Sequence, residues 1–160
     1  MKTFYSFLFP RCADEKIFSL FLLAMRLFLG ILFMIHGFDK LNHYSELSTV
    51  FADPLGIGSR LSLILVLFSE LVCSAVFMLG FLYRLGMIPM IIDMLVAFVF
   101  AHHGSLAQGE LALVYLLSFI LMYAVGPGRY SIDFFIDRGL MKMQQSAKPY
   151  STDDTMRRNE

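Results

Sequence analysis

The segment that decides the fold lies near the start of the chain, where residues 17–38 read IFSLFLLAMRLFLGILFMIHGF. Within this run only Arg26 carries a fixed charge. A helix needs about 20 predominantly apolar residues to cross the hydrocarbon core of a bilayer. The length and apolar character of residues 17–38 therefore predict a first transmembrane helix.

Three later segments are also long and apolar, namely residues 61–82, 86–101 and 110–126. Apolar residues make up 58% of the 160-residue chain and charged residues only 16%, whereas soluble domains contain about 25% charged residues. A chain of this size has too much surface to bury so much apolar area in water. We expect an all-α integral membrane four-helix bundle, formed by residues 1–138. The formal net charge of zero argues against a nucleic-acid binder.

The Lys and Arg residues outside the four spans predict the orientation. Four spans place both termini and the loop between the second and third spans on one side. Of the 13 Lys and Arg residues, that side carries ten, the other side carries Lys40 and Arg60, and Arg26 lies within a span. Because cytoplasmic loops are enriched in Lys and Arg, we expect both termini to be cytoplasmic. The polar residues 139–160 predict a disordered cytoplasmic tail.

Charged residues occur inside three of the predicted spans: Arg26, Glu70 and Asp93. A charge at the centre of a spanning helix costs about 2.5–3.5 kcal/mol on insertion scales. Counted from the inner ends of the spans, the three residues lie at depths of roughly 13, 18 and 10 Å. We therefore expect them to meet inside the bundle. Such a cluster is either a centre that handles protons or binds a substrate, or a structural ion pair that fixes the helix register.

One face of the first helix carries Arg26, Gly30, Phe33, Gly37 and Lys40, which are spaced three or four residues apart. Small residues let two helices approach closely in lipid. The two glycines thus predict close helix packing, with Arg26 and Lys40 at the inner and outer parts of the same face.

The histidines and cysteines limit the candidate chemistry. All four histidines fall near the outer boundary, with His36 ending the first span and His102 and His103 ending the third. Adjacent residues on a helix point about 100° apart, so the pair does not suit a single metal ion. Wet interfacial histidines, a metal or haem site, and a proton relay or quinone contact remain alternatives. Cys12 and Cys73 exclude a disulfide framework and a CxxC pair.

After the fourth span, residues 126–133 read GPGRYSID. Gly126 and Gly128 on either side of a proline end the helix. Ser131 is placed to cap a short amphipathic segment, in which Asp133 is the second residue. No Lys-Ser/Thr follows, so these glycines do not form a phosphate-binding loop.

Several of these pieces together resemble the DoxX family of small four-helix membrane proteins. The resemblance covers about residues 20–137, and the GPGRYSID stretch is its most specific part. The other matching positions are Arg26, Gly30, Gly37, Lys40, Glu70, Leu79, Gly80, Arg84 and His102.

The resemblance implies a bacterial inner-membrane protein linked to an oxidoreductase system. The name-giving members are subunits of quinone-linked sulfur-compound oxidation, and others are partners of soluble redox or thiol-stress proteins. We therefore expect a membrane component of a redox system, with quinone as the small molecule. Any electron transfer needs a quinone or the cofactor of a partner protein.

The expected site has three parts. Arg26, Glu70 and Asp93 form the proton-handling centre. His36, Lys40, His102 and Arg84 contact the substrate or a partner. Gly30, Gly37, Gly126, Gly128, Ser131 and Asp133 have structural roles. No metal site is predicted. The alternatives are a non-catalytic scaffold or stress-linked assembly factor, and a small proton-coupled permease; self-association of the chain is left open.

Overall fold

The structure, a computed structural model, describes residues 14–147. Its elements are the α-helices α2 (Glu15–Asn42), α3 (Tyr44–Val50), α4 (Ser59–Leu67), α5 (Ser74–Leu79), α6 (Tyr83–Val96), α7 (Leu106–Val125) and α8 (Ile132–Ala147), and the π-helices η1 (Phe68–Cys73) and η2 (Ala97–Ala101). The described residues contain no strand. The predicted all-α class is confirmed.

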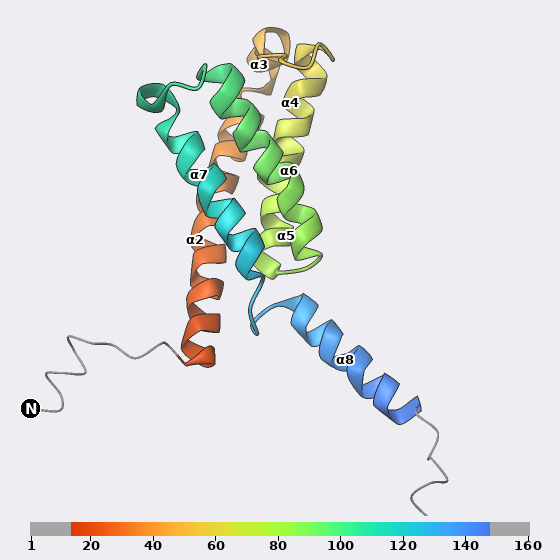
Figure 1. Ribbon diagram of the computed structural model, residues 1–160. Helices are drawn as coiled ribbons and strands as arrows, with labels where there is room; N and C mark the ends of the chain where they lie inside the picture. The colour runs from red at the N-terminus through yellow and green to blue at the C-terminus, as the bar shows by residue number, and fades with distance from the viewer. Residues whose placement is uncertain (1–13, 148–160) are drawn as a thin grey trace, which may run out of the picture.

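Four helical stretches are long and apolar enough to cross a membrane: Glu15–Asn42, Ser59–Leu79, Tyr83–Ala101 and Leu106–Val125. Figure 1 shows these stretches packed lengthwise as one bundle, with α8 outside it. The prediction of four spans is confirmed, although the boundaries differ. The second span ends at Leu79, three residues before the predicted end, because Gly80 takes a left-handed conformation with φ +64°.

Aromatic rings from three spans fill the interior of the bundle. Phe33 of α2 lies with its ring centroid 5.1 Å from that of Phe119 on α7, and Phe77 of α5 lies 5.8 Å from Phe119. All three side chains are fully buried. Apolar side chains such as Phe28 and Leu117 are instead exposed on the outside. This outward apolar surface requires a lipid bilayer around the bundle.

Close contact between α2 and the second span fixes their antiparallel register. A Cβ atom on Gly37 would lie 2.9 Å from the Cβ of Glu70 in η1, and a Cβ on Gly30 would collide with Met78 in α5. Neither glycine has room for a side chain. The two helices can approach this closely because small residues occupy the contact.

The C-terminal boundary predicted from composition is wrong in one respect. Residues 139–147 were expected to be disordered, but α8 continues through Gly139 to Ala147. Its apolar residues Leu140 and Met143 extend the helical pattern that begins at Ile132, which a composition count does not detect. Cys12 and residues 148–160 lie outside the described residues.

Candidate functional site

The helix register brings Lys40, Glu70 and Asp93 to one level of the bundle. Gly37 faces Glu70, and Lys40 follows Gly37 by one helical turn. Gly86 of α6 packs on Val76, where a Cβ would lie 2.9 Å from Cγ1 of that valine. Because α6 runs antiparallel to η1 and α5, residues near 93 return to the level of Glu70.

Lys40 and Glu70 form a buried ion pair. The Lys40 ammonium donates to both carboxylate oxygens of Glu70, at 2.6 and 2.7 Å from Nζ. The Glu70 side chain is only 2% exposed, and that of Lys40 is 26% exposed. The ammonium thus closes over a carboxylate that has almost no access to solvent, which is the geometry that makes a buried pair tolerable.

Asp93 of α6 adds a second carboxyl group to this site. Its Oδ2 atom is buried with the Ser69 hydroxyl as a polar neighbour, and neither atom makes a hydrogen bond of good geometry among the described residues. One ammonium beside two carboxyl groups leaves an excess negative charge unless one carboxyl is protonated. The site therefore has unused hydrogen-bonding capacity within a largely apolar surrounding.

Two π-helical segments border the site. One is η1, which carries Ser69 and Glu70, and the other is η2, which begins four residues after Asp93. π-Helical turns are rare and are frequently found at functional sites. Hydropathy cannot reveal them, because it does not report on the hydrogen-bond pattern of a helix.

A cavity of about 580 Å³ extends from these charged residues. Lys40, Glu70 and Asp93 lie at its polar part, together with His36 and Tyr115. Ser62, Ser69 and His102 also line the cavity, and most of the remaining wall is apolar. Its volume falls within the 300–1,000 Å³ that is usual for small-molecule sites.

The cavity is bordered on one side by lipid-facing residues. Leu65 of α4, Phe68 of η1 and Ile92 of α6 line it and are each about half exposed. α6 packs on η1 and α5 but not extensively on α4, so the two helices separate towards the outer end. The mouth between them faces the bilayer.

The loop between α3 and α4 covers the outer end of the cavity through Phe51, Pro54 and Ile57. Asp53 organises this loop by accepting hydrogen bonds from the backbone N–H groups of Ile57 and Gly58 and from the Ser62 hydroxyl, at 3.0, 2.6 and 3.0 Å. These hydrogen bonds stabilise the carboxylate and lower the pKa of Asp53 below its ordinary value. The largest effect comes from the Gly58 N–H, and the Ser62 hydroxyl adds to it.

His36, His102 and Tyr115 all line the cavity. The His36 ring meets that of Tyr115 edge to face, with centroids 6.1 Å apart. The described residues contain no group of three or more His, Cys, Asp or Glu side chains arranged to hold a metal ion. Tyr115, Ser69 and Asp53 were not singled out from the sequence, because none interrupts a hydropathy pattern.

The expected meeting of Arg26 with the two carboxylates is wrong. Arg26 is fully buried, and its Nη2 donates to the carbonyl oxygen of Tyr130. A Cβ on Gly80 would collide with its guanidinium, so Arg26 lies at the level where α5 ends. It is 14 residues before Lys40 on the same helix, which corresponds to about 21 Å. The depth estimate failed because α2 begins well before the level at which the other spans end.

The segment after α7 is hydrogen-bonded to the inner end of the bundle. The Asp133 carboxylate accepts from the N–H groups of Leu82 and Tyr83, both at 2.9 Å, and so caps the start of α6. The Asp133 N–H donates to the Gly80 carbonyl at 3.0 Å. Ser131 Oγ accepts from the Phe134 N–H at 3.2 Å and thereby caps α8, as predicted.

The remaining motif residues lie at this same inner end. Gly126 and Gly128 have φ of +91° and +77° and make the turn from α7 towards α8. Arg84 is exposed and lies over the ring of Tyr123, with 5.7 Å from Cζ to the ring centroid. Arg84 does not line the cavity, so the structure separates it from His36, Lys40 and His102.

Comparison with known proteins gives the same picture of a membrane protein. An uncharacterized membrane protein of Mycobacterium tuberculosis is 27% identical over 138 residues, covering 69% of this chain and 78% of that protein. No solved structure matches the chain. The DoxX family profile matches residues 21–103, the stretch that contains Arg26, Lys40, Glu70 and Asp93. The chain therefore belongs to the DoxX family.

Proposed function

We propose that this protein is the quinone-binding membrane component of a redox system. The observation that carries the proposal is the cavity that faces lipid on one side and contains the buried Lys40–Glu70 pair and Asp93 on the other. A quinone has a similar separation into an apolar part, its tail, and a polar part, the ring that bears two carbonyl oxygens.

The position of the mouth favours a lipid-soluble ligand over a water-soluble one. Leu65, Phe68 and Ile92 border the cavity on the bilayer side. A molecule dissolved in the membrane reaches the polar groups without crossing an aqueous gate. Its tail remains between α4 and α6 while the ring occupies the interior.

The polar groups suit the proton balance of quinone reduction. A quinone takes up two electrons and two protons to become a quinol. The Lys40 ammonium is a hydrogen-bond donor for a ring carbonyl, and protonated Asp93 or Glu70 is a proton donor for the developing phenolate. His36 and His102 contact the ring or pass replacement protons from the outer surface. The two cysteines of this chain, Cys12 and Cys73, do not form a CxxC pair. The two electrons therefore come from a reduced cofactor of a partner protein, such as a flavin.

Binding can be tested without knowing the electron donor. The chain contains no Trp, so Phe33→Trp introduces a single fluorophore into the cavity wall. We expect decyl-tailed benzoquinone to quench this fluorescence saturably in vesicles. In the same background Asp93→Asn removes the proton donor, and binding should weaken by up to about tenfold, since a hydrogen bond between neutral groups contributes about 0.5–1.5 kcal/mol.

Glu110→Gln is the matched control, because Glu110 is an exposed carboxylate on α7 and does not line the cavity. Its binding curve should equal that of the reporter variant. Quenching that does not saturate, or that is equal in all three proteins, would refute quinone binding at this site.

The alternative function is a non-catalytic scaffold or assembly factor. The complete pairing of Lys40 with Glu70 favours it, since such a pair can serve helix register alone. The double variant Lys40→Met/Glu70→Met decides between a scaffold and a quinone-binding protein. If it folds and supports the assembly of its partner complex but no longer binds quinone, the site is a ligand site.

We also propose that the protein resides in a bacterial inner membrane with the start of α2 and α8 on the cytoplasmic side. The support is the excess of Lys and Arg on that side of the sequence. Alkaline phosphatase fused after Ala147 should be inactive and the same enzyme inserted in the α3–α4 loop active. The reverse result would overturn the orientation.

A further inference from the structure

The helix α8 has an apolar face that no other described helix covers. Positions 132, 135, 136, 140 and 143 fall on one arc of a helical wheel. The residues there are exposed: Ile132, Phe135, Ile136, Leu140 and Met143. Asp137 and Arg138 lie on the opposite arc together with Phe134 and the exposed Met141. Phe134 and Asp137 line a hollow that Phe18 and Leu22 of α2 also line, and the Phe134 ring is 5.4 Å from Cζ of Arg138.

The start of α8 is held at a defined depth. Asp133 binds the backbone at Gly80, Leu82 and Tyr83, and Arg26 binds the carbonyl of Tyr130. These bonds place the first turn of α8 directly at the inner ends of α5 and α6. Both of those helices belong to spans, so α8 begins at the boundary of the membrane.

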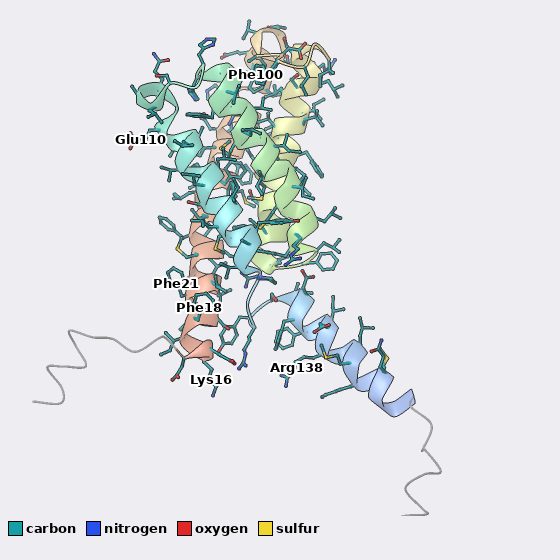
Figure 2. All side chains as sticks on the ribbon, viewed as in Figure 1. Lys16, Phe18, Phe21, Phe100, Glu110 and Arg138 are labelled. Carbon is teal, nitrogen blue, oxygen red and sulfur yellow. The ribbon has the colours of Figure 1, made fainter. Side chains whose placement is uncertain are left out.

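The first turns of α2 reach the same level as the beginning of α8, and the rest of α8 slants away from the bundle (Figure 1). Figure 1 shows α2 extending past the ends of α5 and α7 on the side where α8 lies, and Figure 2 shows Phe18 and Phe21 on this extension. The side chains of Ile17, Phe18 and Phe21 are 60%, 44% and 55% exposed. Arg129, in the segment that leads into α8, pairs with Glu15 at the start of α2. Lipid must therefore extend to this level to cover α2.

We propose that α8 lies in the headgroup–acyl boundary of the inner membrane surface, with its apolar face in lipid and Asp137 and Arg138 towards water. The occupant of this face is the bilayer because the neighbouring turns of α2 already require lipid at that depth. The apolar surface of the spans also continues through the exposed Leu82, next to the Asp133 contacts. Helices of this type bury one face by about 5–10 Å.

Two neighbouring residues provide the test. The chain contains no Trp, so each substitution introduces a single fluorophore into the full-length protein. Phe135→Trp places it on the apolar face of α8, and Phe134→Trp places it on the opposite face. In vesicles whose acyl chains are brominated near the headgroup, we expect Trp emission from position 135 to be shifted to the blue and largely lost. Emission from position 134, which is half-buried in the hollow beside Phe18 and Leu22, should be lost less.

Leu140→Trp is a second reporter on the apolar arc and should behave as position 135 does. Because α8 lies outside the bundle core, these substitutions leave the spans intact, which far-UV circular dichroism checks. If positions 135 and 140 emit as water-exposed Trp and are quenched strongly by aqueous acrylamide, the proposal is overturned and the face is free for a protein partner. Stronger lipid quenching at position 134 would also overturn it.

Discussion

Replacing Lys40 by Met tests the buried pair most directly. The substitution keeps a long side chain but removes the charge that lies 2.6 and 2.7 Å from the two oxygens of Glu70. Removing one partner of a buried pair destabilises a protein by about 3–5 kcal/mol. The Lys40 side chain is 26% exposed, so water already weakens the attraction. We therefore expect the free energy of unfolding to fall by an amount near the lower limit, about 3 kcal/mol.

The double variant Lys40→Met/Glu70→Met should recover most of this loss. Without the Glu70 carboxylate neither member of the pair is left buried and unpaired, and apolar replacement of a whole buried pair is often neutral or stabilising. Unfolding in mixed micelles with increasing dodecyl sulfate, followed by circular dichroism, measures both variants. Arg129→Met is the matched control, because Arg129 and Glu15 form an exposed pair whose loss should change stability by less than about 1 kcal/mol.

The stabilising role of the buried Lys40–Glu70 pair is refuted if Lys40→Met is no more destabilising than Arg129→Met. It is also refuted if the double variant is as unstable as Lys40→Met alone. Either result would mean that Glu70 does not depend on Lys40 for its burial.

Three further predictions concern the two ends of the bundle. Gly80→Ala should lower the free energy of unfolding by at least about 1–2 kcal/mol, because the φ of Gly80 is +64° and a Cβ would collide with Arg26. Gly139 has open space around it, so Gly139→Ala should not destabilise the protein in the same micelle titration. Ser131→Ala should lower the stability of α8 by about 1 kcal/mol, seen as faster amide exchange in its first turn. Folding lowers the pKa of Asp53, so its stabilisation of the loop is intact above the ordinary Asp range and is lost as pH falls through the lowered value. Loop amide exchange should therefore accelerate in strong acid, and Asp53→Asn should remove that pH dependence.

The spans could be predicted because hydropathy over 20 residues reports directly on lipid exposure. The capping role of Ser131 could also be predicted, since an N-cap depends on residues close in sequence. Gly37 pointed to the correct face of the first helix, and Lys40 on that face does lie at the site.

The membership of the charged cluster could not be predicted in full. Depths counted from the ends of apolar runs assume that all runs end at one level, and α2 violates this assumption by extending past α5 (Figure 1). Arg26 therefore lies with Gly80 and Tyr130 rather than with Glu70. The π-helical turn that carries Glu70 has no counterpart in hydropathy. Such features depend on how whole helices meet, not on local composition.

The guanidinium of Arg26 has a consequence for how the protein is made. Its only hydrogen-bond acceptor among the described residues, the carbonyl of Tyr130, lies 104 residues later in the chain. At about 5–20 residues per second, the ribosome needs some seconds after α2 emerges before that acceptor exists. During this interval the guanidinium depends on water and lipid headgroups at the inner boundary of the membrane, and the exchange of these partners for Tyr130 is possible only after the segment that follows α7 has been synthesised.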